Sequence, residues 1–298
     1  MERWKFNLHK NEAINLITYK RCTEVKEEAI FQAFQIGFSD YMIKMDLPKD
    51  VFFRHFFGPE GNRLEYSVIA FDGDKPVGLN MGGIKEYEGV KTLRCGGFCV
   101  HPDYRGTGIS GKLFELHKEI ALENHCKQLF LEVIAGNDRA INFYKKQGYE
   151  KVYDLIYYSH SNPTEIRGTL DIDATIERID MDGLRSLGGQ IRDIHINWQN
   201  DMDYIGHFAD QVHYGAFHDN KLIGALSIHP KGKISFLWVE PRYRHKGIGR
   251  TLVSRAVEEL QPQKLSVNFP NNANLLGFAK RLNFSLDPIS QYEMYITL

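Results

Sequence analysis

The fold of this chain is decided by residues 97–119, which read GFCVHPDYRGTGISGKLFELHKE. The segment starts with apolar residues typical of a strand, turns at His101 and Pro102, and passes through a loop with Arg105 and two glycines. The helix predicted after the loop has one apolar face, because its apolar residues are three or four positions apart: Ile109, Leu113, Leu116 and Ile120. Such a loop directs unpaired backbone N–H groups and the positive end of a helix dipole at one point, which favours binding of phosphate groups.

A second segment, residues 238–260, repeats this pattern as WVEPRYRHKGIGRTLVSRAVEEL. Both segments fit the frame V-x-P-x-Y-R-x-x-G-I-x-x-x-L, which starts at Val100 and at Val239. Other positions recur with a shrinking offset of 146, 139 and 135 residues, for the pairs Lys75 and Lys221, Pro102 and Pro241, Asn137 and Asn272. We therefore predict two tandem copies of one fold, of which the second has shorter loops.

The repeated frame resembles the coenzyme A-binding motif of the GNAT superfamily of N-acetyltransferases, whose core reads R-x-x-G-x-G/A. The second copy has the whole core, Arg244, Gly247 and Gly249, whereas the first has Arg105, Gly108 and a small Ser110 in the last position. Residues 131–149, LEVIAGNDRAINFYKKQGY, resemble the second signature of that family, N-x-x-A-x-x-F-Y-x-x-x-G-F/Y.

The resemblance implies an α/β fold of the mixed α+β type, made of two tandem acyl-CoA N-acyltransferase (GNAT) domains. Each is expected to be a mainly antiparallel sheet, splayed near its centre and flanked by helices, with the pantetheine arm in the splay. We place the N-terminal domain at residues 1–160 and the C-terminal domain at residues 169–298, because the segment between them, 161–168, is polar and rich in turn-forming residues.

Hydrophobic periodicity and turn residues predict the individual elements. In the first copy we expect strands at 14–20, 66–71, 75–84, 93–100, 128–134 and 152–159, the last of which closes the unit. Helices are expected at 26–38, after Pro48, after the loop that contains Arg105, and at 137–147, where Asn137 is the predicted N-cap. In the second copy we expect strands at 174–178, 211–217, 222–228, 233–239, 264–269 and 293–297, with helices at 184–196 and 273–282 besides the helix after its loop.

Acyl transfer from a thioester to an amine needs a base for the amine proton and an acid for the leaving thiolate. Glu132, on a strand beside the cofactor groove, is the candidate base, and Tyr144, on the next helix, is the candidate acid that the resemblance implies. Backbone N–H groups near residues 98–100 could hold the carbonyl oxygen. The second copy has Ala279 in place of Tyr144, and Val267 or Ser266 in the region of Glu132. We therefore expect a catalytic N-terminal domain and a C-terminal domain that binds coenzyme A without turnover or shapes the substrate cleft.

The cofactor implied by the resemblance is acetyl-CoA, and direct attack in a ternary complex is the expected mechanism. Its predicted contacts come from both copies: Phe98, Val100, Arg105, Gly106, Thr107, Gly108, Ile109, Ser110, Asn137, Tyr144, Val239, Arg244, His245, Lys246, Gly247, Ile248 and Gly249. A nucleotide-binding loop is a competing interpretation of residues 106–112, GTGISGK, but Leu113 follows where a Mg²⁺-binding hydroxyl is needed. A second competing interpretation is that Cys95 or Cys99 is a catalytic nucleophile, although a small buried thiol is the simpler interpretation of either residue.

Composition limits the remaining classes of function. The chain has 298 residues, a formal charge of −1, four cysteines without framework spacing, and no apolar run long enough to span a membrane. We expect a cytoplasmic protein with no metal site and no nucleic-acid or membrane partner. The acceptor is expected to be a small-molecule or peptide amine; its identity, the length of the acyl group and the oligomeric state stay open. A non-catalytic acyl-CoA sensor is the alternative function.

Overall fold

The computed structural model describes residues 17–298, which divide into two compact units. Within the described residues, the first unit consists of 17–133, Asn137–Lys151 and Met294–Leu298, and the second of Ile134–Gly136 and Val152–Glu293. Residues 14–16 of the first predicted strand lie outside the described range. The remaining part of that strand is present as β1.

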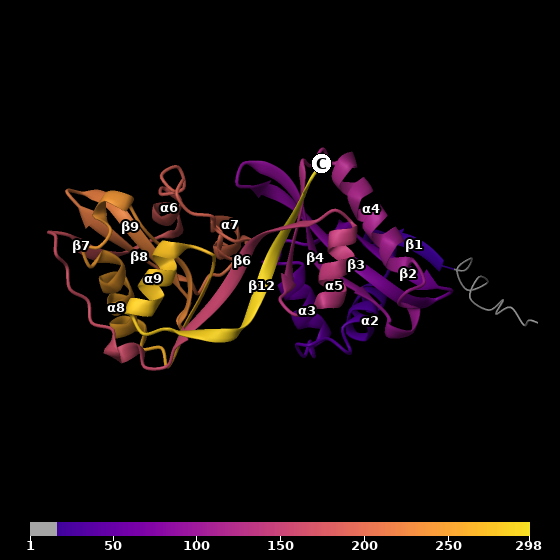
Figure 1. The fold of residues 1–298 in the computed structure, drawn as a ribbon, viewed down its shortest axis with the longest axis horizontal. Helices are drawn as coiled ribbons and strands as arrows, with labels where there is room; N and C mark the ends of the chain where they lie inside the picture. The colour runs from indigo at the N-terminus through magenta and orange to yellow at the C-terminus, as the bar shows by residue number, and fades with distance from the viewer. Residues whose placement is uncertain (1–16) are drawn as a thin grey trace, which may run out of the picture. The chain divides into compact units, whose positions relative to one another are not determined.

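The first unit is a mostly antiparallel sheet with the strand order β1-β2-β3-β4-β5-β12 (Figure 1). Within it, β4 and β5 are parallel neighbours, connected through α4. The strands are β1 (Ile17–Arg21), β2 (Arg63–Asp72), β3 (Lys75–Tyr87), β4 (Val90–Val100), β5 (Gln128–Ile134) and the end of β12 (Ser285–Thr297). The helices are α2 (Glu27–Gly37), α3 (Lys49–Phe56), α4 (Ile109–Glu123) and α5 (Asp138–Lys146).

The two faces of this sheet are covered by different helices, because alternate residues of β3 point to opposite sides. Leu79 and Met81 join a buried cluster with Phe34 of α2 and Phe52 of α3. The neighbouring Gly78 faces the other way, and a Cβ at this position would meet Leu113 and Ile109 of α4 at about 3 Å. Of the predicted apolar face of α4, Ile109, Leu113 and Ile120 are buried and Leu116 is half-buried.

The second unit repeats the arrangement with the strand order β12-β6-β11-β10-β9-β8-β7. Its strands are β6 (Glu150–His160), β7 (Thr175–Ile179), β8 (Val212–His218), β9 (Lys221–Ile228), β10 (Lys233–Val239), β11 (Leu265–Pro270) and the first part of β12. Its helices are α6 (Met181–Arg185), α7 (Met202–Ile205), α8 (Ile248–Leu260) and α9 (Ala273–Arg281). Both units thus confirm the predicted fold class.

The strand at 152–159 does not close the first unit, so that prediction is wrong. It forms part of β6, which pairs antiparallel with β11 of the second unit, from His160 with Leu265 to Leu155 with Pro270. The last residues of β12 belong to the first unit instead, where the Leu298 N–H donates to the Lys127 carbonyl at 2.9 Å. Periodicity identifies a strand but carries no information on its partner. The predicted domain boundaries, 1–160 and 169–298, stay a prediction about the two sequence repeats.

The helix predicted over residues 184–196 is also wrong. The helix α6 ends at Arg185, and the following residues form turns and loop up to the short 3₁₀ helix Trp198–Asn200. The apolar residues that suggested a helix pack irregularly, since Leu184 and Leu187 are buried against Phe236 and Trp238 of β10. Two consecutive glycines, Gly188 and Gly189, weaken any helix through this segment.

Two general features concern the part of the chain that the structure describes. No helix in residues 17–298 is long and apolar enough to cross a membrane. No group of three His, Cys, Asp or Glu side chains in that range could hold a metal ion. All four cysteines are free and buried.

The packing of α4 gives a test of the fold. Leu113 is fully buried, whereas Leu122 on the same helix is 53% exposed. We expect Leu113→Ala to lower the free energy of unfolding by about 2–5 kcal/mol, because it leaves a cavity between α4 and the sheet. Leu122→Ala should change it by less than about 0.5 kcal/mol. Urea denaturation of both variants measures the difference; equal effects would contradict this packing.

Candidate functional site

The centre of the first unit is a splay between the parallel strands β4 and β5. Their pairing runs from Thr92 with Gln128 to Cys95 with Leu131, although β4 continues to Val100 and β5 to Ile134. At the point of separation β4 has a bulge, since Cys95 faces Gly82 of β3 and Gly97 faces Met81, which leaves Gly96 as the extra residue. The splay leaves backbone groups of both strands without a ladder partner at the centre of the sheet.

The same construction recurs in the second unit. The strands β10 and β11 pair at Lys233 with Ser266 and at Ile234 with Val267, and then separate. The extra residue of the β10 bulge is Ser235, because Ile234 faces Ile228 and Phe236 faces Ser227. Ser235 lies 139 positions after Gly96, the offset that also relates Pro102 to Pro241. This register places Asn268, rather than Val267 or Ser266, at the position of Glu132.

The loop after β4 leads directly into α4. Gly106 and Gly108 have φ angles of +76° and +96°, which favour glycine, and Gly108 is the N-cap of the helix. A Cβ at either glycine would meet no heavy atom of the described residues within 4 Å. No side chain in the described part of the chain caps α4. The first backbone N–H groups of α4 therefore have no side-chain partner among the described residues.

The arginine of the motif shapes this loop. Arg105 donates from Nε to the Val100 carbonyl at 3.1 Å and from Nη2 to Asp40 Oδ1 at 2.7 Å. In the second unit Arg244 donates in the same way to the Val239 carbonyl at 2.9 Å, and it pairs with Asp193. Both arginines thus fix the end of a central strand to the segment after the first helix of their unit. The cofactor contact predicted for them stays a prediction.

The two aspartates were not identified from the sequence. Asp40 and Asp193 are 153 positions apart, an offset that fits no other repeated pair, because loops of different length separate them from the motif. The signal in the sequence that could have linked these aspartates is the trend of the offsets between equivalent positions of the two repeats, which decrease along the chain. The Arg105 hydrogen bonds lower the pKa of the Asp40 carboxyl from 3.8 to about 2.

The other predicted residues of this loop have different environments. Thr107 donates its hydroxyl to the Tyr104 carbonyl at 2.6 Å, Ile109 is buried under the helix, and Ser110 lies half-buried in the first turn of α4. Asn137 is the N-cap of α5, as predicted, and accepts the Ala140 N–H at 3.3 Å. Its counterpart Asn272 caps α9.

The candidate acid Tyr144 lies on α5 near the edge of the splay. Its ring centroid is 6.3 Å from that of Phe98 on β4, and Phe98 also stacks on Phe143 at 5.4 Å. The Cys95 thiol, which influences the pKa of Tyr144, donates to Asn80 Oδ1 at 3.3 Å. Burial raises the pKa of Tyr144 well above its ordinary value, with a smaller contribution from Cys95. The phenol is therefore protonated at neutral pH and available as a donor.

The candidate base Glu132 is part of a buried ion-pair network. Its Oε2 accepts from Arg94 Nε at 3.0 Å and from Nη2 at 2.6 Å, and Arg94 also pairs with Glu60 at 2.6 Å. Burial alone would lower the pKa of Arg94, but the Glu132 and Glu60 carboxylates hold it above its ordinary value. The structure thus brings Glu132 to the splayed strand β5 and gives its carboxylate a permanent cationic partner.

The loop of the second unit borders a cavity of about 380 Å³. Val239, Arg244, His245, Gly247, Ile248 and Gly249, all predicted cofactor contacts, line it together with residues of α9. Lys246 is not among the lining residues, and its ammonium group lies 5.7 Å from the centre of the Tyr243 ring. The segment 169–171 packs against the loop: the Asp171 N–H donates to the Lys246 carbonyl at 3.2 Å, and Thr251 Oγ1 to the Thr169 carbonyl at 3.3 Å. Unlike Gly108, Gly247 is covered, because a Cβ there would lie 1.8 Å from the Thr169 carbonyl oxygen.

Comparisons with known proteins agree with this geometry. The model of the acetyltransferase (GNAT) family matches residues 28–149 and 187–284. A thialysine N-epsilon-acetyltransferase from Bos taurus is 45% identical over 49 residues, which are 16% of this chain and 29% of that protein. An acetyltransferase from Sodalis glossinidius is 35% identical over 83 residues, 28% of this chain and 56% of that protein. The chain thus spans only about a third to a half of the length of these curated relatives.

Solved structures resemble the whole chain. A GCN5-related N-acetyltransferase from Sphaerobacter thermophilus has a TM-score of 0.67 at 11% identity, covering 95% of this chain and 96% of that one. A tandem GNAT protein from the clavulanic acid biosynthesis pathway has a TM-score of 0.66 at 14% identity, covering 94% and 98%. At such low identity these similarities concern the fold alone.

The contact between Asp40 and Arg105 gives a prediction about pH. Because the pKa of Asp40 is lower in the folded chain than its ordinary 3.8, its ion pair adds stability above about pH 4 that is lost as the pH falls towards 2. We expect Asp40→Asn to lower the melting temperature modestly at pH 7, since the carboxylate is half exposed. The difference from the wild type should disappear towards pH 2.

Thermal unfolding between pH 7 and pH 2 measures this difference. Asp74→Asn is the matched control, because Asp74 is an exposed carboxylate at the turn between β2 and β3. A melting-temperature difference for Asp40→Asn that stays constant over the whole pH range would contradict the ion pair.

Proposed function

Because the chain belongs to the acetyltransferase (GNAT) family, we propose that it transfers an acetyl group from acetyl-CoA to a primary amine. The observation that carries the proposal is the first unit's combination of an open glycine loop at the start of α4 with a buried, protonated Tyr144 near the splay. The loop offers backbone N–H groups to a diphosphate, and the splay offers unpaired strand edges to a chain that carries amides. The described residues therefore fit a coenzyme A thioester.

The bound thioester would supply an activated acyl group with a good leaving thiolate. Tyr144 would give its phenolic proton to that thiolate, which is reasonable because a thiol has a pKa of about 8.5 and a phenol one of about 10. The residue can do this only as the neutral phenol, the form that burial maintains. The proton lost by Tyr144 is returned from the amine or from solvent.

Glu132 is the proposed acceptor of the amine proton, directly or through a water. Its partnership with Arg94 sets a condition on this role, because a carboxylate that already accepts two charge-assisted hydrogen bonds is a weaker base. We therefore propose that Glu132 acts with Arg94 as a unit that orients the amine. Primary amines of small molecules or peptides are the proposed acceptor class.

For the second unit we propose binding of coenzyme A without turnover. Its loop borders a cavity large enough for part of such a carrier, but Ala279 and Asn268 stand at the positions of Tyr144 and Glu132. Neither side chain can exchange a proton at neutral pH. The alternative is a non-catalytic sensor, in which both units bind acyl-CoA and neither transfers the acyl group. Turnover of acetyl-CoA with any amine would exclude this alternative.

The acid role of Tyr144 can be tested by removing one hydroxyl. We expect Tyr144→Phe to lower kcat by about 100-fold or more, because general acid catalysis contributes about 10²–10⁴ to rates. The affinity for coenzyme A should stay the same, since the ring is retained. Thiol release from acetyl-CoA over a panel of amines measures kcat, and calorimetric titration measures binding.

Tyr149→Phe is the matched control. Tyr149 packs on Tyr144 with ring centroids 5.6 Å apart, and its hydroxyl has no hydrogen-bond partner among the described residues. The control should keep full activity. Full activity in Tyr144→Phe itself would overturn the assignment.

A further inference from the structure

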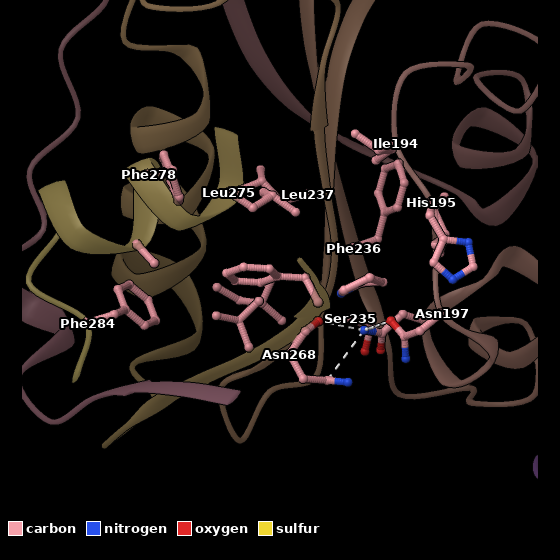
Figure 2. A pocket seen from close by; sticks show the side chains of 17 residues that line it. Ile194, His195, Asn197, Ser235, Phe236, Leu237, Asn268, Leu275, Phe278 and Phe284 are labelled. Carbon is pink, nitrogen blue, oxygen red and sulfur yellow. Dashed lines mark hydrogen bonds between the residues drawn. The ribbon is translucent and has the colours of Figure 1, made fainter. Parts of the chain in front are cut away.

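The splay of the second unit contains a small cavity, in addition to the larger one at the loop. Figure 2 shows the side chains that line the small cavity. It lies between β10 and β11, with walls from residues 194–200 on one side and α9 on the other. One wall residue is Ala279, which corresponds to Tyr144 of the first unit. A methyl group thus stands here in place of the phenol ring of the first unit.

The polar side chains of this cavity have unused hydrogen-bonding capacity. Asn200 Nδ2 donates to Asn197 Oδ1 at 2.9 Å and to the Asn268 carbonyl at 2.9 Å, which fixes the orientation of both amides. Asn197 Nδ2 and Asn200 Oδ1 then remain without a partner in the described part of the chain, although both residues are more than 95% buried. Two residues that line the cavity thus contain one donor and one acceptor without a partner, which is unfavourable for buried polar groups.

The small cavity continues the larger one. Four residues line both: Ile194, Leu237, Leu275 and Phe278. Figure 2 shows Leu237 and Leu275 near the start of α9, with Asn197, Ser235 and Asn268 grouped at the other end of the cavity. A coenzyme A thioester whose phosphates lie at the loop around Gly247 would therefore have its acyl end directed towards the asparagines.

The size and charge of the cavity limit what that end can be. Its volume of about 40 Å³ is room for about three water-sized groups, by the measure in which one water needs about 10–15 Å³. No lysine or arginine is among the described residues that line it. The lining histidine, His195, is hydrogen-bonded to Glu293 at 2.6 Å. A carboxylate would be buried there without a cation, which is strongly unfavourable.

We propose that the second unit binds a coenzyme A thioester whose acyl group is longer than acetyl and carries a neutral hydroxyl. A hydroxyl is both donor and acceptor, so it can donate to Asn200 Oδ1 and accept from Asn197 Nδ2 at the same time. The apolar carbons of the acyl group would fill the space beside Ala279. The inference rests on the proposed binding of coenzyme A by this unit and adds its acyl specificity.

Calorimetric titration of the full chain with four thioesters tests the proposal without any mutation. 3-Hydroxybutyryl-CoA should bind more tightly than butyryl-CoA, by about fivefold for each hydrogen bond gained. Butyryl-CoA should in turn bind more tightly than acetyl-CoA, and succinyl-CoA should bind most weakly. Equal affinities for the hydroxylated and the plain butyryl ester, or tighter binding of succinyl-CoA, would overturn the proposal.

A pair of variants then assigns the preference to this cavity. Ala279→Phe fills the space and should reduce the affinity for 3-hydroxybutyryl-CoA to that for acetyl-CoA, whereas Ala279→Ser keeps the space and should retain the preference. If a properly folded Ala279→Phe, as judged by its melting temperature, keeps the preference, the assignment is wrong. Acetyl transfer, measured with the Tyr144 variants, is independent of these outcomes, so failure here leaves the activity of the first unit untouched.

Discussion

The separation of two parallel strands is the constraint on which the rest of this structure depends. In each unit the hydrogen-bond ladder between the central strands stops, after Cys95 with Leu131 and after Ile234 with Val267. Because unpaired backbone groups inside a protein are costly, a sheet opened at its centre must be supported on both sides. The bulges at Gly96 and Ser235 provide part of this support by turning each strand away from its parallel neighbour. A side chain at position 96 would displace the buried Asn62 carboxamide, since a Cβ there would lie 2.1 Å from its oxygen.

The second shared feature is the clamp between the motif arginine and an aspartate. It joins the end of the central strand to the segment after the first helix, through Arg105 and Asp40 in one unit and Arg244 and Asp193 in the other. The clamp fixes the start of the glycine loop that follows. The two units therefore share this contact even where their sequences differ.

The chemistry on this common frame has diverged. In the first unit the buried Cys95 thiol donates to Asn80 and influences the pKa of the buried Tyr144. The strand registers place Leu226 and Ile234 at the positions of Asn80 and Cys95 in the second unit, and the repeated motif places Ala279 at that of Tyr144. Three polar residues have thus been replaced together by apolar ones. A partly retained group would leave a buried donor or acceptor unsatisfied, so its members are lost as a set. The second unit has instead an asparagine cluster on the opposite wall of its splay.

Local sequence signals determined most elements of both repeats, the glycine loops, the Asn137 cap and the position of Tyr144, because each depends on residues a few positions apart. The helix predicted at 184–196 is the exception. What periodicity could not give is the partner of a strand: β6 pairs with β11, and the end of β12 belongs to the first unit. Nor could it give the ion pairs of Asp40 with Arg105 and of Glu132 with Arg94, which join residues 65 and 38 positions apart. Only the tertiary structure decided these, since the free energy of a strand pair or a buried ion pair depends on neighbours that the local sequence does not contain.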